Sequence, residues 1–236
     1  MENLYLEVSN ATTSYKNFTV KNVNFSLKSG QIMGLIGGSG SGKSTLIKTI
    51  VGLKKLDKGK INLYVNNNLV DIKEHLGYSP QENSLFPYLT LKENIIAFGK
   101  LKGLGKNYIN DRMNLLLKKL KLDYAKDKKI VELSGGMAKR ADLIIALLHD
   151  PEVIILDEPF SGLDFSLIKF IWNTMGDLAK EGKIVIVSSH LLPDIQRHCT
   201  NLGFVYGGDF YDTKQLIYIM KQKKLFSLED LFEKVL

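Results

Sequence analysis

The stretch QIMGLIGGSGSGKST at residues 31–45 decides the fold of this chain. Its first part, Ile32 to Ile36, is a short apolar run typical of a buried parallel strand, and the run ends at Gly37 and Gly38. The pattern Gly37-x-x-x-x-Gly42-Lys43-Ser44 follows at once. Glycines in such a loop let backbone N–H groups converge on a phosphate without interference from a Cβ atom. The stretch therefore predicts a strand, a phosphate-binding loop and a helix, in that order.

The residues that follow the glycines indicate how a phosphate is held. Lys43 is expected to reach the β- and γ-phosphates of a nucleotide, and the Ser44 hydroxyl is expected to coordinate Mg²⁺. The helix expected from Ser44 to Val51 points its positive N-terminal end at the same anion. A Gly/Ser-rich loop that only makes a turn is the alternative. The order of strand, loop, Lys-Ser pair and apolar helix favours phosphate binding.

Composition limits the class of protein. A chain of 236 residues suffices for one large α/β domain, or for two small ones sharing a core. The one cysteine, Cys199, excludes an intrachain disulfide and fits a reducing compartment. No apolar run reaches the roughly 18 to 20 residues that a membrane-spanning helix needs. No signal peptide is evident at the start, so a cytoplasmic protein is expected.

The formal charge of +7 has two possible meanings. A basic protein can bind nucleic acid or an anionic membrane surface. Here the lysines are scattered without interleaved aromatic residues or a recognition motif, so a solvated surface is the favoured interpretation and no nucleic-acid partner is expected. The small groups of lysines are Lys54 and Lys55, Lys118 and Lys119, and Lys128 and Lys129.

Antiparallel strands are predicted on either side of the loop. Residues Leu4 to Val8 and Phe18 to Leu27 alternate apolar and polar side chains, which is typical of half-exposed strands. Residues 61–65 and 69–72 predict a hairpin around a run of three asparagines. The next element, at 75–78, ends at Ser79-Pro80, and this leaves Gln81 on a loop.

The period changes to that of helices between Leu91 and Lys121, where a break at Gly103-Leu104-Gly105 separates two amphipathic helices. The segment Leu133 to Gly136 closes this region and leads into a third helix, which Asp150-Pro151 stops. A helical insertion within an α/β domain is therefore expected.

Two further strands deliver polar side chains to one edge of the sheet. The apolar run Val153 to Leu156 ends in Asp157-Glu158, and the strand from Lys183 to Val187 ends in Ser188-Ser189-His190. The alternation of strands and helices predicts a parallel sheet with right-handed crossovers. A carboxylate at the carboxyl end of such a strand, beside a phosphate loop, lies where Mg²⁺ is held. The carboxyl edge of the sheet is therefore the candidate site.

Taken together, these segments resemble the nucleotide-binding domain of ABC (ATP-binding cassette) transporters over nearly the whole chain. The strongest piece is LSGGM at 133–137, supported by the glutamine loop, LDEP at 156–159, SGLD at 161–164 and His190 after a strand. The resemblance implies an α/β P-loop NTPase with an antiparallel β subdomain and an inserted α-helical subdomain. It implies one domain over 1–236: a catalytic core with the β subdomain at 1–84 and 150–212, a helical subdomain at 85–149, and a C-terminal helical tail at 213–236.

The resemblance also implies a role for each matching residue. Tyr15 matches the aromatic residue that stacks on adenine. Gln81 matches the loop glutamine that contacts Mg²⁺ next to the surface that docks a membrane subunit. Asp157 matches the aspartate that holds Mg²⁺ largely through water, and Asp164 matches the loop that links two nucleotide sites. The residues matching the phosphate loop are Gly37, Gly38, Ser39, Gly40, Ser41, Gly42, Lys43, Ser44 and Thr45.

Catalytic roles follow in the same way. Glu158 matches the general base that polarises the attacking water, and His190 matches the residue that touches the γ-phosphate; Lys43 and Gln81 complete the implied catalytic set. The signature residues Ser134, Gly135 and Gly136 are expected to contact ATP held by the opposite protomer. Met137 stands where the family often has glutamine, as in some drug-resistance exporters. No role is implied for three other histidines and one tryptophan, for which structural roles are expected: His75, His149, His198 and Trp172.

The resemblance implies an ATP-binding, Mg²⁺-dependent ATPase that works as a head-to-tail dimer, either of two copies or with a sister ATPase. Its partner would be a polytopic membrane permease on a separate chain, and its place the cytoplasmic face of the cell membrane. The segments SLEDLFEKVL at 227–236 and GYSPQENSLFPYLTLKEN at 77–94 resemble exporter subunits, which favours export. A soluble ABC ATPase that drives assembly of a protein complex is the alternative.

Overall fold

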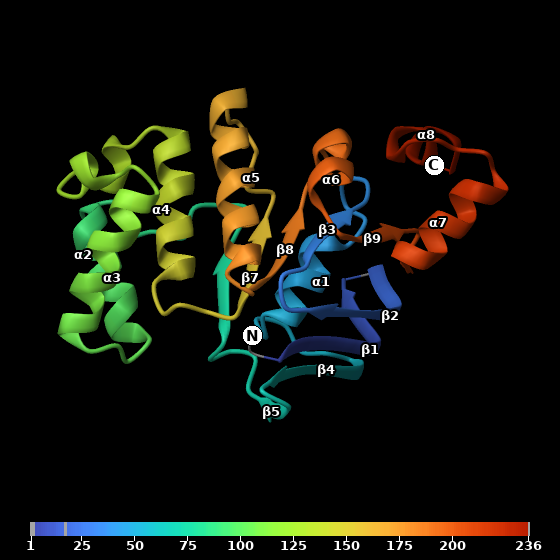
Figure 1. The fold of residues 1–236 in the computed structure, drawn as a ribbon, viewed down its shortest axis with the longest axis horizontal. Helices are drawn as coiled ribbons and strands as arrows, with labels where there is room; N and C mark the ends of the chain where they lie inside the picture. Colours follow the sequence, from blue (N-terminus) through green and yellow to red (C-terminus); the bar gives the residue numbers. More distant parts are fainter. Residues whose placement is uncertain (1–2, 17, 236) are drawn as a thin grey trace.

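The computed structural model describes residues 3–16 and 18–235, so the expected domain limits at 1 and 236 lie outside it. Its strands form one ten-stranded sheet in the order β5-β4-β1-β2-β10-β9-β3-β8-β7-β6. Figure 1 shows the sheet in the middle of the molecule, with the helices of residues 91–147 at one end and the C-terminal helices at the other. No helix in the described part of the chain combines the length and the apolar character needed to cross a membrane.

The parallel part of the sheet carries the phosphate loop. Strands β3 (Ile32–Ile36), β8 (Ile184–Ser188), β7 (Val153–Asp157) and β6 (Leu76–Ser79) run parallel to one another, and β9 (Asn201–Tyr206) pairs in parallel with β3. Every residue of β3, β7 and β8 is buried. Helices cover both faces of these strands, which explains why their sequences are continuous apolar runs.

The antiparallel part lies beside it. Strand β1 (Leu4–Tyr15) pairs with β2 (Phe18–Lys28) and with β4 (Lys58–Val65), and β5 (Asn68–Val70) completes the predicted hairpin. Strand β1 is longer than predicted. The register shifts between Val8 and Ala11, and the bulge interrupts the alternation of buried and exposed side chains that marks a strand in the sequence.

A tenth strand, which the sequence did not predict, joins the two parts. The segment β10 (Asp209–Asp212) pairs antiparallel with β9 and makes a single parallel bridge to β2, between Asp209 and Lys21. The sequence suggested only a turn at 207–209 followed by a helix. With four residues, β10 is too short to show a periodic pattern.

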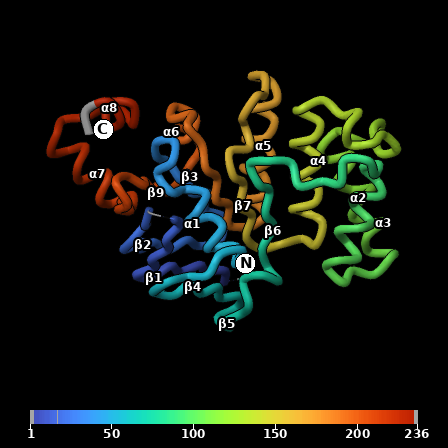
Figure 2. The backbone as a smooth tube through the Cα atoms, turned by 180° about the vertical axis from the view of Figure 1, so that it is seen from behind, coloured from blue at the N-terminus to red at the C-terminus, as the bar shows by residue number. Residues whose placement is uncertain are grey.

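The helices fall into three groups (Figures 1 and 2). Helix α1 (Lys43–Ile50) packs on one face of the sheet with the antiparallel strands, and α5 (Phe165–Lys180) and α6 (Leu192–His198) pack on the other. The C-terminal group contains α7 (Thr213–Gln222) and α8 (Leu228–Val235). The third group, here called the helical arm, comprises α2 (Leu91–Leu101), α3 (Lys106–Lys119), two short 3₁₀ turns at Asp123–Ala125 and Ile130–Glu132, and α4 (Gly135–Leu147).

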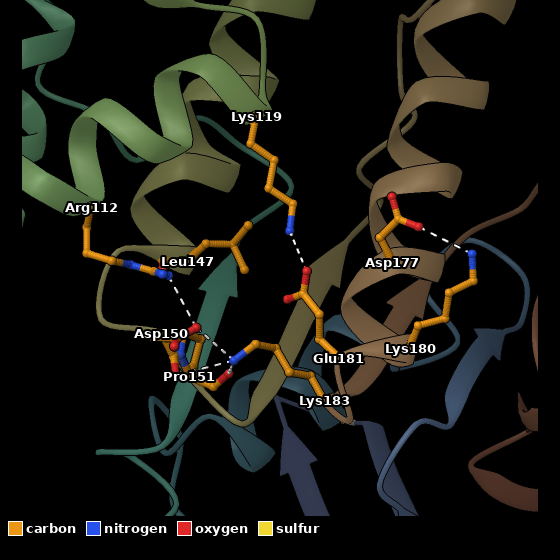
Figure 3. A network of polar contacts seen from close by, with 9 residues as sticks. All are labelled: Arg112, Lys119, Leu147, Asp150, Pro151, Asp177, Lys180, Glu181 and Lys183. Carbon is orange, nitrogen blue, oxygen red and sulfur yellow. Dashed lines mark hydrogen bonds and ion pairs between the residues drawn. The ribbon is translucent and has the colours of Figure 1, made fainter.

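A polar network attaches the far end of the helical arm to the sheet (Figure 3). Asp150 Oδ1 lies 3.2 Å from Arg112 Nη2 of α3 and 2.8 Å from Lys183 Nζ, just before β8. Arg112 also donates to the carbonyl of Leu147 at 2.8 Å, close to the end of α4. Nearby, Lys119 Nζ of α3 lies 2.9 Å from Glu181 Oε1, directly after α5. Asp150 thus connects the arm to the core at the point where the chain passes between them.

The structure places the tryptophan and the three histidines for which the sequence implied no role in catalysis. Trp172 is buried, with its ring stacked between those of Phe160 and His198. His75 pairs with Glu152 at 2.9 Å. Burial lowers the pKa of His149 to about 4, so this imidazole is neutral at physiological pH. These contacts agree with the structural roles expected for them from the sequence.

Candidate functional site

Two kinds of glycine build the loop between β3 and α1. A Cβ atom on Gly37 would lie 2.5 Å from the carbonyl oxygen of Val205, and one on Gly42 would lie 2.4 Å from Val20 Cγ2. These two glycines allow close packing. Cβ atoms on Gly38 and Gly40 would meet nothing within 4 Å. The loop is therefore fixed by packing at its two ends and open in its middle, which leaves room for a ligand against the backbone.

Lys43 and Ser41 direct polar groups into this loop. Lys43 Nζ donates to the carbonyls of Gly37 at 2.8 Å and Gly38 at 3.1 Å. Burial lowers the pKa of Lys43, while the nearby Glu158 and Asp157 carboxylates oppose that shift. The Ser41 hydroxyl is buried and has no hydrogen-bond partner among the described residues. A phosphate would satisfy both the cation and the orphan hydroxyl, so this loop fits that ligand.

A hollow of about 210 Å³ adjoins the loop. It is lined by Tyr15, Phe18 and residues 40–45, so it joins an aromatic wall to the N-terminus of α1. Tyr15 is 56% exposed and is the last residue of β1, whereas the sequence had placed it between two strands. Phe18 was missed as a site residue. Its position at the start of an alternating strand gave no reason to separate it from ordinary packing residues.

Two carboxylates lie at the carboxyl edge of the sheet, as expected. Asp157 is 2% exposed and Glu158 is 8% exposed. The Ser188 hydroxyl, at the end of the adjacent strand, donates to Asp157 Oδ1 at 2.6 Å and accepts the backbone N–H of Glu158 at 2.8 Å. Glu158 has a φ of +47°, a conformation that a residue with a side chain rarely adopts. The hydrogen bond from its backbone to Ser188 helps to hold it there.

His190 contacts Glu158 from the side that faces solvent. Its Nδ1 lies 3.0 Å from Glu158 Oε2, and the side chain of His190 is 66% exposed against 11% for that of Glu158. A carboxylate only accepts hydrogen bonds, so the imidazole donates here. The structure therefore brings Glu158, His190 and Asp157 together at one edge of the sheet.

Gln81 lies exposed on the loop after β6, where the sequence placed it. Its backbone carbonyl accepts a hydrogen bond from Lys139 Nζ of α4, a contact that the sequence did not suggest. Burial lowers the pKa of Lys139, and the carboxylates of Asp142, Asp157 and Glu158 oppose that shift, in decreasing order. Lys139 therefore interacts electrostatically with the carboxylates at the edge of the sheet. In the sequence it looked like any lysine on the polar face of a helix.

The signature residues and Asp164 begin helices. Ser134 Oγ accepts the N–H of Met137 at 3.3 Å and caps α4, and Asp164 Oδ1 accepts the N–H of Leu167 at 2.9 Å and caps α5. A Cβ on Gly136 would lie 2.4 Å from Leu167 Cδ2, whereas one on Gly135 would meet nothing within 4 Å. A Cβ on Gly136 would therefore require the Leu167 side chain to move, whereas one on Gly135 would face open space.

The hollow at the phosphate loop has no lining residue from the helical arm. Within one chain, Ser134, Gly135 and Gly136 therefore do not take part in it.

The metal ligands expected from the sequence are Ser44, Gln81 and Asp157. Among the described residues, no group of three or more His, Cys, Asp or Glu side chains could hold a metal ion. Mg²⁺ usually takes few protein ligands and completes its shell with water and substrate phosphates. One buried carboxylate on β7 and one hydroxyl at the start of α1 match that pattern, so the residues present fit Mg²⁺ bound with a nucleotide.

Comparison with known proteins gives a consistent picture. Residues 20–161 match the model of the family described as ABC transporter. The chain is 33% identical over 192 residues to the Nod factor export ATP-binding protein I of Burkholderia lata, covering 80% of this chain and 63% of that protein. It is 35% identical over 208 residues to the linearmycin resistance ATP-binding protein LnrL of Bacillus subtilis, covering 86% of this chain and 67% of that protein.

Solved structures agree. An ATP-binding subunit of an ABC transporter superposes with a TM-score of 0.82 at 27% identity, covering 97% of this chain and 98% of the other. A dimeric ATP-binding cassette bound to ADP and Pi superposes with a TM-score of 0.75 at 26% identity, covering 88% and 98%. The fold class expected from the sequence, a P-loop α/β domain with antiparallel β and helical subdomains, is confirmed.

Proposed function

The chain belongs to the ABC transporter family, and from this premise we propose that it binds and hydrolyses ATP to power a separate membrane permease. The permease would be a polytopic protein, and this chain would lie peripherally on the cytoplasmic face of the cell membrane. Export is the direction we propose, because the relatives named above act in Nod factor export and linearmycin resistance. The chain spans only 63% of the first of these relatives, so their substrates are not transferred to it.

The observation that carries the proposal is the pairing of an open phosphate loop with a buried, oriented carboxylate. Lys43 would donate to the β- and γ-phosphates, and Ser41 and the N–H groups of the loop would complete the cradle. Tyr15 would stack on the adenine ring. Glu158 would orient the attacking water and take its proton, with His190 holding the carboxylate and reaching the γ-phosphate.

Mg²⁺, when bound, supplies positive charge beside the phosphates, and we propose that Ser44, Asp157 and Gln81 hold it. Phosphoryl transfer depends mainly on positioning and charge neutralisation rather than on covalent chemistry with the protein. The Ser188 hydroxyl supports the Asp157 carboxylate directly and Glu158 through its backbone N–H.

We propose that the working unit is a head-to-tail dimer, of two copies or with a sister ATPase. In it, Ser134, Gly135 and Gly136 of one protomer would contact the ATP held by the other, and Asp164 would lie on the loop between the two sites. The dimeric cassette among the structural neighbours supports this arrangement. The open space at Gly135 supports it too, because a ligand approaching from another chain finds no side chain in its way.

A groove beside the glutamine loop supports the proposed permease partner. Its volume is about 530 Å³, and Pro80 and Ser84 line it together with three lysines; none of the described residues that line it is a carboxylate. Its apolar lining includes Val51, Leu53, Leu76, Phe98, Ile145 and Leu148.

We propose the same division of the chain as the sequence suggested, with the core and β subdomain at 1–84 and 150–212, the helical subdomain at 85–149 and the tail at 213–236. The groove then lies where core and helical subdomain meet.

The experiment that tests this function is isolation of tagged Glu158→Gln protein from its native cells with ATP and detergent, followed by mass spectrometry of stoichiometric partners. A co-purifying polytopic membrane protein supports the transporter subunit, and its identity narrows the substrate. A purely soluble complex overturns the transporter proposal in favour of an assembly ATPase.

A further inference from the structure

Two side chains on one face of α4 hold the loop that carries Gln81. Lys139 Nζ donates to the carbonyl of Gln81 and lies 3.5 Å from that of Pro80. One turn later, Asp142 Oδ1 accepts the Ser84 hydroxyl at 3.1 Å and its N–H at 3.4 Å. Residues three apart on a helix project from the same face. Lys139 and Asp142 therefore grip the two ends of the segment 80–84.

These polar groups are held at a cost to stability. Asp142 is 1% exposed, and its second oxygen, Oδ2, has no hydrogen-bond partner among the described residues. Burial raises the pKa of Asp142 to about 6 and lowers that of Lys139. If the segment 80–84 were left free in water, neither Asp142 nor Lys139 would have to be buried against it, and the cost of burying each charge would be avoided. The contacts fix one position of the loop rather than adding to the free energy of unfolding.

The position of Lys139 in the chain connects three parts of the site. It lies in α4, which begins at the signature turn of Ser134. Its ammonium donates to the backbone carbonyl of Gln81, and burial lowers its pKa against the opposing charges of Asp142, Asp157 and Glu158. A shift of the loop relative to the carboxylates would therefore have to break or move the contact made by Lys139.

We propose that Lys139 and Asp142 form a clamp that sets the position of Gln81 relative to the catalytic carboxylates. Lys139 is a positioning residue, since it acts through the backbone of the loop. The proposal rests on the proposed function as an ATPase. It has a second consequence: because both clamp residues belong to α4, the glutamine loop and the signature turn move as one body.

The test compares Lys139→Met with Lys139→Arg, which restores a donor, and with Lys118→Met, the same change at an exposed position on α3. Hydrogen exchange of the amides at 81–84 is measured without nucleotide. ATPase kinetics give kcat, the KM for ATP and the Mg²⁺ concentration for half-maximal activity. Thermal unfolding checks that each variant is folded.

For Lys139→Met we expect loop exchange to rise about 10-fold, because the hydrogen bond to the Gln81 carbonyl is lost. We expect kcat to fall about 10-fold or more and the Mg²⁺ requirement to rise several-fold, as for other residues that position a metal ligand. The KM for ATP stays within about twofold, since the phosphate loop is untouched. Lys139→Arg recovers most of the activity, and Lys118→Met matches the wild type.

A second variant keeps the test decisive if Lys139→Met does not fold. Ser84→Ala removes the hydroxyl that bonds Asp142 from an exposed loop position, and it should raise exchange at the same end of the loop. Unchanged exchange in the folded variants overturns the clamp. Raised exchange with unchanged kcat and Mg²⁺ dependence overturns the positioning role. A wild-type protein without ATPase activity overturns the proposed function alone, because the exchange measurement needs no nucleotide.

Discussion

The imidazole of His190 donates from Nδ1 to Oε2 of Glu158 across 3.0 Å, so an exposed ring is tied to a nearly buried carboxylate. The backbone of Glu158 is fixed as well, by its hydrogen bond to Ser188. Glu158 is therefore held at two points, its carboxylate by His190 and its backbone by Ser188. A base that is oriented in advance needs little rearrangement in the transition state.

The first prediction concerns that carboxylate. Glu158→Gln preserves the volume of the side chain and removes its ability to take a proton. We expect ATP binding and ATP-dependent dimers to persist while hydrolysis falls by about 100-fold or more. Phosphate release and light scattering after size exclusion measure the two properties. Full turnover in this variant would remove Glu158 as the base.

Lys43→Ala tests the phosphate loop. The ammonium is buried and donates only to loop carbonyls among the described residues, so its loss removes the main cation for the phosphates. We expect calorimetry to detect no ATP binding, with the protein still folded. Lys60→Ala, an exposed lysine on β4, is the matched control and should bind ATP normally. Unchanged affinity in Lys43→Ala would refute the loop assignment.

Alanine substitutions at Gly135 and Gly136 are expected to affect different properties of the protein. In Gly136→Ala the new methyl group displaces Leu167, whereas in Gly135→Ala it enters open space. Both gain helix propensity, so we expect Gly136→Ala to have a free energy of unfolding about 1 kcal/mol below that of Gly135→Ala. Gly135→Ala should instead slow ATP-dependent dimerisation. Chemical denaturation and light scattering separate the two effects, and equal stabilities would contradict the packing role of Gly136.

Asp142 should make stability depend on pH. Burial raises the pKa of Asp142 in the folded protein to about 6, well above the usual range of an aspartate. A raised carboxyl pKa means that the folded state binds the proton more tightly, so this group's contribution increases as pH falls through about 6. Between pH 7 and pH 5 we expect the wild type to gain about 1 kcal/mol relative to Asp142→Asn. Parallel pH profiles of the free energy of unfolding in the two proteins would contradict this.

Sequence patterns predicted the parts of the fold that depend on burial and turn chemistry. Strands β3, β7 and β8 are continuous apolar runs with abrupt ends, because both faces are covered and the chemistry begins where the run stops. The end of β1 was missed because a bulge breaks its alternation. Strand β10 was missed because it has only four residues, although Gly207-Gly208 forms the turn of its hairpin with β9; its bridge to β2 is a long-range contact that no local pattern shows.

The residues of the candidate site also fall into those that the sequence predicted and those that only the folded chain shows. Asp157 and Glu158 stand at the end of β7, and Lys43 stands in the loop pattern that follows β3, so the sequence places all three at the edge of the sheet. Lys139 acts on a loop 58 residues earlier in the chain, and a lysine on a helix carries no local sign of such a contact. Phe18 is similar, since only the folded chain shows that its ring lines the hollow. The catalytic roles themselves remain predictions.

The contacts of Asp150 restrict how the helical arm can move relative to the sheet. The chain enters the arm after β6, where Lys139 holds the loop, and leaves it near Asp150, which binds both Arg112 and Lys183. A rigid body held at two separated points keeps one easy degree of freedom, rotation about the line that joins them. In this chain that axis runs from the glutamine loop to Asp150. Because Lys139 lies in α4 and Asp150 follows its end, α4 lies close to this axis, so a swing about it would carry the parts of the arm that lie away from α4 furthest and leave the signature turn in register with the glutamine loop.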